Sequence, residues 1–238
     1  MTEQVDIIAF GAHPDDVEIG CGGLLAKEAR LGYKTAIVDL TKGEMSTNGT
    51  VEERQAEAAE AMGILGAVWR QNLEIPDRGI TVNDDYVARV VKVLRTYRPK
   101  LILAPYWEDR HPDHAAASRL IQEAHFAAGL RKLLPELPPY RPVEVLYYFL
   151  HQDIKPDFVV DVTEVFEIKK AAILAHQSQF GRRNKMLPTI LNGGFPSALE
   201  SRNLYYGSKI RALQAEGFVV KNWLEVRDPL EFWGAKGV

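Results

Sequence analysis

Two histidine-containing tetrapeptides carry the residues of this chain that could do chemistry. The first is H-P-D-D at residues 13–16 and the second is H-P-D-H at residues 111–114. Two imidazoles and one carboxylate form a catalytic metal site with an open position for water, and such a metal lowers the pKa of that water to about 7. A remaining carboxylate could take the proton of the water and pass it to a leaving amine. The pair therefore predicts a metal site in two halves and favours a hydrolase.

The positions of the tetrapeptides along the chain predict how they meet. Each follows an apolar run that is typical of a buried strand, at residues 5–10 and 101–104, and further strands are expected at 35–40 and 68–73. Helical patterns alternate with them over residues 22–31, 50–65, 86–97 and 115–128. This alternation predicts a Rossmann-like α/β fold with a mostly parallel sheet flanked by helices. Ligands bind at the carboxyl ends of the strands in such folds, so we expect the active site there.

The second half of the chain has weaker patterns. Strands are expected at residues 143–150, 158–162 and 218–220, helices at 163–175 and 197–213, and a loop at 176–196. We find no internal repeat and no linker that would divide the chain. The length therefore predicts a single domain over residues 1–238.

Composition excludes several classes of function. The 238 residues are 46% hydrophobic, and the net charge of −3 comes from 29 basic and 32 acidic residues that are interspersed. No basic stripe for nucleic acid is present, and no apolar run approaches the roughly 20 residues of a membrane span. The single cysteine, Cys21, has no internal partner for a disulfide, and residues 2–4 show no charged-then-apolar leader. We expect a cytoplasmic protein that binds neither nucleic acid nor membrane.

The tetrapeptides have two alternative interpretations. A His-Pro-Asp sequence can be a turn whose aspartate caps a helix, but a cap gives no reason for the histidine, least of all twice in equivalent contexts. The glycines at positions 20, 22 and 23, with Asp39 after the second strand, suggest a dinucleotide site. Their spacing differs from G-x-G-x-x-G, and they lie too far from the strand for a tight phosphate turn. From the residues alone, it stays open which aspartate would bind metal.

The motifs resemble a known family. G-A-H-P-D-D-V-E-I-G-C-G-G at residues 11–23, T-K-G-E at 41–44 and H-P-D-H at 111–114 are similar to LmbE-type, or PIG-L-type, deacetylases. Those metal-dependent enzymes remove acetyl groups from N-acetylglucosamine-containing compounds. The resemblance extends over residues 5–176. Within the family, residues 40–55 and H-Q-S-Q-F at 176–180 resemble the bacillithiol branch, which deacetylates N-acetylglucosaminyl-malate, a small amino-sugar conjugate.

The resemblance implies a role for each motif residue. It makes His13, Asp16 and His114 the zinc ligands and Asp15 the general base. His111 would stabilise the tetrahedral oxyanion, with Asp113 orienting its imidazole; these six positions are His13, Asp15, Asp16, His111, Asp113 and His114. The ligand types suit iron(II) as well as Zn2+. The resemblance also implies a homo-oligomer, with a hexamer as one form. A deacetylase of another N-acetylglucosamine compound and a non-catalytic metal-containing carbohydrate binder are the alternatives.

Substrate contacts rest on two arginines. The resemblance implies that Arg54 binds substrate, whereas its helical spacing equally suits a surface ion pair with Glu53 or Glu57. Arg110, directly before His111, could hold the malate end or be a solvated loop residue.

Four further residues could also carry chemistry by their type. Cys21 is expected to be a packing residue, and His125 and His151 are expected to be structural. His176 lies in a family-like segment whose role the sequence does not give.

Overall fold

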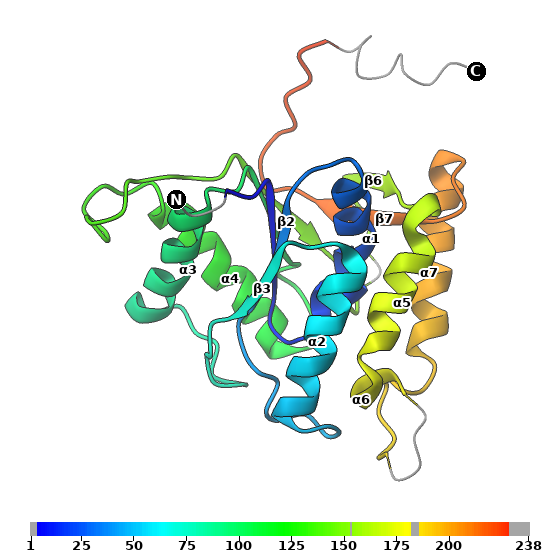
Figure 1. Ribbon diagram of the computed structural model, residues 1–238. Coiled ribbons are helices and arrows are strands. Elements are labelled where there is room, and N and C mark those ends of the chain that lie inside the picture. Colours follow the sequence, from blue (N-terminus) through cyan, green and yellow to red (C-terminus); the bar gives the residue numbers. More distant parts are fainter. Residues whose placement is uncertain (1–3, 153, 182–185, 229–238) are drawn as a thin grey trace.

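One seven-stranded sheet organises the part of the chain described by the computed structural model, residues 4–152, 154–181 and 186–228 (Figure 1). The strand order is β3-β2-β1-β4-β5-β7-β6. Strands β1 to β5 pair in parallel, and β7 runs antiparallel to both β5 and β6. Their bounds are β1 Ile7–Gly11, β2 Thr35–Asp39, β3 Trp69–Asn72, β4 Leu101–Pro105, β5 Glu144–Tyr148, β6 Phe158–Asp161 and β7 Ala215–Val219. The predicted mostly parallel α/β sheet is confirmed.

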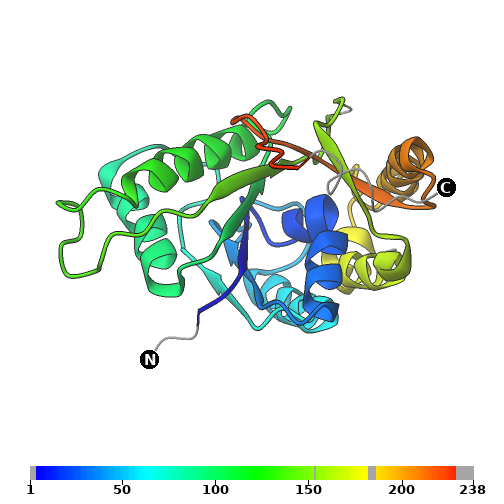
Figure 2. The same ribbon diagram turned by 90° about the horizontal axis from the view of Figure 1, so that it is seen from above.

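Helices cover both faces of this sheet. Helices α3 and α4 pack on one face, and α1, α2 and α5 pack on the other, as the view from above shows (Figure 2). The bounds are α1 Asp16–Arg30, α2 Val51–Leu65, α3 Asp84–Tyr97, α4 Pro112–Ala127, α5 Phe166–Ala175, α6 Gln177–Phe180 and α7 Phe195–Ile210, with a 3-10 turn at Thr163–Val165. Among the described residues, no helix is long and apolar enough to cross a membrane.

Alternating side chains of β1 supply both halves of the core. Ile8 and Phe10 belong to the cluster under α3 and α4, and Ile7 and Ala9 belong to the cluster under α1, α2 and α5. A strand covered on both faces needs apolar side chains at every position rather than at every second one. This is why residues 5–10 form an almost unbroken apolar run.

Local signals placed several helix ends correctly. The expected capping box opens α2: Glu53 N donates to Thr50 Oγ1 at 3.2 Å, and Thr50 N donates to Glu53 Oε2 at 2.9 Å. Helix α4 begins at Pro112, earlier than the expected start at residue 115, with His111 as its N-cap residue. Beyond residue 175 the expectations were less accurate. The predicted loop contains the short helix α6, and β7 begins at Ala215 rather than at residue 218.

The start of α1 was predicted wrongly. The helix begins at Asp16 and not at residue 22, because two of its glycines serve close packing rather than a turn. A Cβ on Gly20 would lie 2.0 Å from Cδ2 of Tyr148, and one on Gly23 would lie 2.9 Å from Glu216 Oε1. The glycines therefore let the helix approach β5 and β7.

A kink at Cys21 divides α1 into two segments. Cys21 has a non-helical φ of −144°. After it, Gly23 N and Leu24 N donate to the two carboxylate oxygens of Glu216 on β7, at 2.8 and 2.7 Å. Lys169 Nζ on α5 donates to the same carboxylate at 2.5 Å. The kinked helix is thus capped internally by a strand from the far end of the chain. Cys21 itself is fully buried and free, as expected for a packing residue.

Candidate active site

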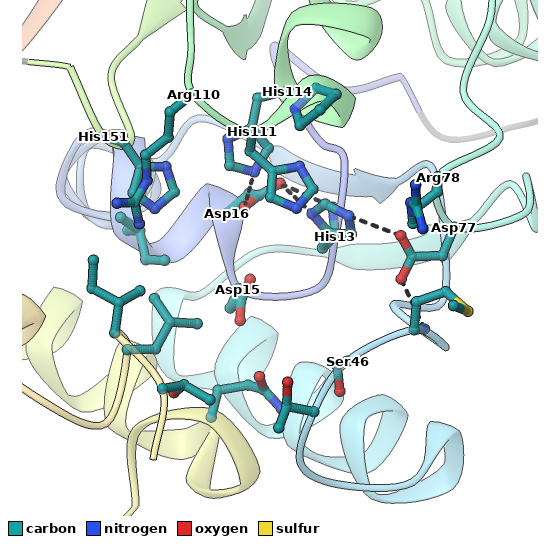
Figure 3. Close-up of a pocket in the computed structure, with 18 of the residues that line it drawn as sticks. His13, Asp15, Asp16, Ser46, Asp77, Arg78, Arg110, His111, His114 and His151 are labelled. Carbon is teal, nitrogen blue, oxygen red and sulfur yellow. Dashed lines mark hydrogen bonds and ion pairs between the residues drawn. The ribbon is translucent and has the colours of Figure 1, made fainter. Parts of the chain in front are cut away.

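The two tetrapeptides meet where β1 and β4 lie side by side. H-P-D-D follows the carboxyl end of β1, and H-P-D-H follows that of β4. Strand β1 has β2 on one side and β4 on the other, so the order of the strands reverses at this point of the sheet. The crevice at such a reversal is the usual ligand site of an open α/β sheet. A cavity of about 480 Å³ opens at this point (Figure 3). Its volume suits a small organic ligand.

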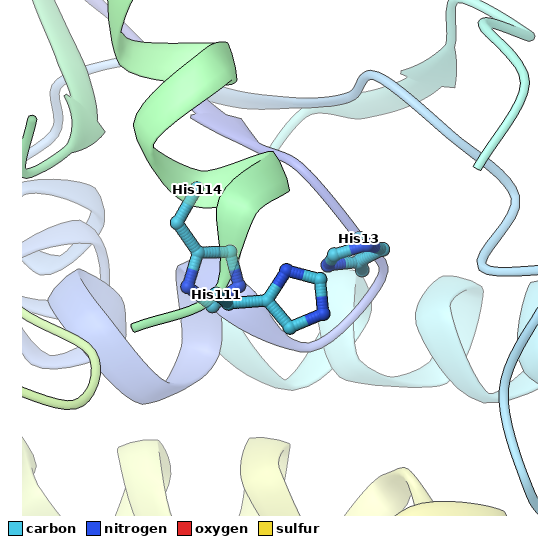
Figure 4. A group of neighbouring side chains, drawn as sticks. All are labelled: His13, His111 and His114. Atoms are coloured by element: carbon cyan, nitrogen blue, oxygen red, sulfur yellow. The ribbon is translucent and has the colours of Figure 1, made fainter. Parts of the chain in front are cut away.

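Three imidazoles come together at the floor of the cavity. Ring nitrogens of His13, His111 and His114 lie within 4.8 Å of one another (Figure 4). Asp16 lies between two of them: its Oδ1 is 3.2 Å from His114 Nε2, and its Oδ2 is 3.5 Å from His13 Nδ1. The backbone N–H of His13 also donates to Asp16 Oδ2 at 2.9 Å. A carboxylate with imidazole nitrogens on both sides is a donor set that fits a divalent transition metal.

A second carboxylate supports His114 from behind. Asp109 Oδ1 lies 3.0 Å from His114 Nδ1, on the opposite side of the ring from Asp16. Metal-binding histidines commonly present their other ring nitrogen to such a carboxylate, which fixes the ring orientation. His151 Nδ1 lies 3.2 Å from the same oxygen, and its ring stacks on His114 with 5.4 Å between centroids. The expectation for His151 therefore needs correcting: it lines the cavity beside the motif histidines.

His13 has acidic support of the same kind. Its Nε2 is 3.3 Å from Asp77 Oδ1 and 3.5 Å from Asp113 Oδ2. Asp113 was expected to orient the imidazole of His111, but its contact with that ring comes from the main chain and not from the carboxylate. Asp113 N donates to His111 Nδ1 at 3.3 Å, while its Oδ2 accepts from Arg78 N at 2.7 Å. The Asp113 carboxylate therefore belongs to the surroundings of His13.

The hydrogen bond from Asp113 N to His111 indicates which ring nitrogen of His111 carries the proton. Nδ1 accepts a hydrogen bond, so in the neutral ring the proton lies on Nε2. Burial lowers the pKa of His111, and the neighbouring imidazoles of His114 and His13 lower it further. A neutral His111 can therefore donate a hydrogen bond from Nε2 into the cavity without needing to be protonated.

Asp15 is buried beside the imidazoles in an unusual backbone conformation. Its φ is +118°, a region that residues other than glycine rarely adopt, and such strain is often found at functional sites. Burial raises the pKa of its carboxyl, while Arg54 opposes this, and the pKa stands at about 6. A carboxylate with a pKa in this range is suited to general base work near neutral pH.

Arg54 points inward from α2 rather than along the helix surface. Its guanidinium donates to Gly43 O at 3.0 Å and Pro14 O at 2.6 Å, and Nη2 lies 3.3 Å from Asp15 Oδ2. The alternative of a surface ion pair with Glu53 or Glu57 is thus wrong. Arg54 lines the cavity and fixes the loop that carries Asp15. Arg110 is exposed and lines the cavity on the side of His151 (Figure 3).

Three residues that contact the motif histidines escaped the sequence prediction: Asp77, Asp109 and His151. Each follows a strand of the sheet, namely β3, β4 and β5, so the rule that ligand groups follow strand ends could have drawn attention to them. They carry no motif spacing, however, and only the folded sheet brings them to the histidines. His125, in contrast, has the expected structural role, since its Nε2 lies 2.9 Å from Pro142 O.

A separate ionic network lies buried behind α1. Arg70 on β3 holds both oxygens of Asp39, at 2.7 and 2.8 Å, and approaches Glu18 Oε1 at 2.5 Å. His176 Nε2 lies 3.1 Å from the same Glu18 oxygen and is fully buried. Asp39 is therefore engaged by Arg70, and His176 joins the segment after α5 to α1.

Comparisons with known proteins show which proteins this chain is similar to in sequence and fold. The family pattern described as "PIG-L: GlcNAc-PI de-N-acetylase" matches residues 8–125. The diacetylchitobiose deacetylase of Thermococcus kodakarensis is 31% identical over 226 residues, covering 89% of this chain and 81% of that protein. A Bacillus subtilis protein named "Probable N-acetyl-alpha-D-glucosaminyl L-malate deacetylase 2" is 28% identical, covering 75% and 84%. The crystal structure of a conserved protein from Thermus thermophilus superposes with a TM-score of 0.86 and 39% identity, covering 94% and 98%.

Proposed function

The chain belongs to the PIG-L, or LmbE-type, family of deacetylases, and from that premise we propose that it is a zinc-dependent hydrolase that removes the acetyl group from an N-acetylglucosaminyl conjugate. The observation that carries the proposal is the position of Asp16 between the imidazoles of His13 and His114, with Asp15 next to it in the same cavity. A ligand set and a spare carboxylate together serve turnover better than binding alone.

Three residues would hold the metal: His13, Asp16 and His114. When bound, the metal supplies Lewis acid chemistry, polarising the acetamide carbonyl and lowering the pKa of water. Asp109 holds the His114 ring in place, and Asp77 does the same for His13, so the ligands are oriented before the metal arrives. Iron(II) fits the same donor types and is the alternative metal.

The remaining residues would move protons and stabilise charge. In the proposed reaction, the oxygen of water adds to the acetamide carbon, and the carboxylate of Asp15 takes the water proton. As the C–N bond breaks, Asp15 passes that proton to the nitrogen, and the products are acetate and a free amine. Nε2 of His111 donates to the carbonyl oxygen as its negative charge grows. Arg54 keeps the Asp15 loop in position.

The preferred substrate in this proposal is N-acetyl-α-D-glucosaminyl L-malate. Support comes from the similarity to the Bacillus subtilis protein of that name and from two exposed arginines in the cavity, Arg78 and Arg110, either of which could pair with a malate carboxylate. A neutral N-acetylglucosamine compound is the second candidate, favoured by the 31% identity to the diacetylchitobiose deacetylase. The single buried, free cysteine suits a cytoplasmic location, which we also propose.

An acetate-release assay on metal-analysed protein tests the proposal. We would compare N-acetylglucosaminyl-malate, diacetylchitobiose and free N-acetylglucosamine at equal concentrations, with chelator-treated protein as the control. We expect release to require the metal and to be fastest with the malate conjugate. Equal rates would remove the malate assignment but keep the deacetylase. No release from any of the three would favour a non-catalytic carbohydrate binder.

A further inference from the structure

The sequence Asp-Arg occurs at two strand ends of the site, and both copies have the same arrangement. Asp77 and Asp109 each approach a motif imidazole, His13 at 3.3 Å and His114 at 3.0 Å. The arginine that follows each aspartate, Arg78 or Arg110, is exposed and lines the cavity. In the close-up, the two arginines flank the histidines on opposite sides (Figure 3). Each pair thus places a carboxylate toward the imidazoles and a guanidinium toward the cavity.

The backbone at Arg78 is fixed to the active site. Its N–H donates to Asp113 Oδ2 at 2.7 Å, and Asp77 Oδ2 accepts from Met45 N at 2.9 Å. The turn closes through Gly79 N, which donates to Pro76 O at 2.8 Å. Arg78 itself has a φ of +62°, in the left-handed region that favours glycine. A long, charged side chain is therefore held where glycine would be less strained, and such strain points to a role for the side chain.

The guanidinium of Arg78 has no partner among the residues that the structure describes: no side-chain hydrogen bond, ion pair or ring contact of Arg78 is found with residues 4–152, 154–181 or 186–228. This separates it from Arg54, whose donors are used by Gly43, Pro14 and Asp15. Five N–H donors in a planar fork match a carboxylate or a phosphate. Such a group at the cavity wall is available to a ligand.

We propose that Arg78 is an anion-binding, specificity-determining residue of this pocket, and that the preferred acetamido sugar carries an acidic substituent that reaches it. The inference rests on the proposed deacetylase function and adds to it the residue that would select the acidic substituent. Arg110, the matching residue of the second Asp-Arg pair, lies on the other side of the histidines. Because the acetamide must lie at the histidines, a substituent that extends past His13 and Asp77 meets Arg78.

The test compares acidic and neutral substrates in matched variants. Deacetylation of N-acetylglucosaminyl-malate and of methyl N-acetylglucosaminide would be measured for wild type, Arg78→Gln, Arg78→Gly, Arg110→Gln and the exposed control Arg131→Gln. We expect both Arg78 variants to lower kcat/KM for the acidic substrate by about 10- to 100-fold, as is usual for a charge-assisted hydrogen bond, and to change the neutral substrate less than about threefold. Arg78→Gly should have an equal or higher Tm, because glycine relieves the positive φ.

Other outcomes of the assay count against the proposal. An equal loss on both substrates would make Arg78 a structural residue, and an acid-selective loss in Arg110→Gln alone would transfer the anion site to Arg110. An absence of deacetylation with every substrate would remove the proposed function instead. In that case, the role of Arg78 is tested separately by calorimetry, which measures the affinity of the same variants for glucosaminyl-malate and for methyl glucosaminide. A selective loss of affinity for the acidic compound in Arg78→Gln supports Arg78, and no loss overturns it.

Discussion

The active site and the network around Arg70 both bury several charged groups, but they balance charge in different ways. Around Arg70, the acids Asp39 and Glu18 share one permanently charged guanidinium at 2.5 to 2.8 Å, and Glu18 also faces the imidazole of His176 at 3.1 Å. In the active site, Asp16, Asp77 and Asp109 face imidazoles. An imidazole is neutral or charged according to its surroundings and is a common metal ligand. The comparison teaches that buried acids whose cationic partners are imidazoles alone leave room for a metal ion, whereas buried acids that an arginine already neutralises do not.

Replacement of Asp15 by Asn in the active site should have the largest effect, a loss of turnover. The variant removes the proposed base while leaving His13, Asp16 and His114 in place. We expect kcat to fall by about 10²- to 10⁴-fold, the usual contribution of general base catalysis, with bound metal unchanged. Acetate release and elemental analysis of the same sample measure the two quantities, with Asp85→Asn on the exposed face of α3 as the control. Near-normal turnover would exclude Asp15 as the base.

Replacement of Arg70 by Met should lower the stability of the fold. It leaves Asp39 and Glu18 buried without their cation, and breaking a buried ion pair on one side costs about 3–5 kcal/mol of the free energy of unfolding. Urea denaturation followed by circular dichroism measures this loss. The control is Arg227→Met, which breaks an exposed pair with Glu225 and should cost no more than about 1 kcal/mol. If the two variants were equally stable, the network would contribute nothing to stability.

A matched pair of aspartate variants separates the two regions directly. Asp109→Asn should weaken metal binding by about 10- to 100-fold, because the support of His114 is lost. Asp39→Asn, at the same depth in the other network, should lower stability and leave metal affinity unchanged. Competition with a chromophoric chelator measures the affinity. Equal affinities in both variants would show that Asp109 does not orient a ligand.

A pH dependence of stability should come from Glu18. Burial raises the pKa of this carboxyl, but Arg70 and His176 lower it more strongly, to about 2, from an ordinary value of 4.5. A depressed pKa means that the folded state favours the ionised form. The contribution is therefore complete above pH 4.5 and is lost as the pH falls from 4.5 toward 2. Thermal melts of wild type and Glu18→Gln should differ above pH 4.5 and converge on acidification. A constant difference would contradict this assignment.

Sequence reasoning predicted the parts of the site that have local signals. Each H-P-D motif followed a recognisable strand, so the meeting of His13 with His114 at one edge of the sheet could be expected. Asp77 and Asp109 could not be found in the same way, since a single aspartate in a loop has no spacing to distinguish it. Their role depends on distances across loops that only the folded sheet brings together.

The same limit explains the errors in the fold. The glycines of α1 indicated a loop because glycine disfavours helices. In the fold, Gly20 and Gly23 are required because a Cβ would clash with Tyr148 or Glu216, which are distant in sequence. Residues 215–217 showed no clear strand pattern, because Glu216 is a buried acid whose partners lie on α1 and α5. Where a residue is required by contacts with residues distant in sequence, the local pattern predicts the wrong secondary structure.

The capping of α1 by Glu216 also bears on the order in which the molecule is completed during synthesis. Asp16 begins α1, and the acid that caps the same helix beyond its kink lies 193 positions after Gly23. A ribosome delivers the two H-P-D motifs long before it delivers β7. Until β7 docks, Gly23 N and Leu24 N lack the carboxylate that accepts from them in the complete fold. The helix that begins at Asp16 is therefore completed only by a strand made near the end of the chain, and we expect a nascent chain to stabilise this helix late.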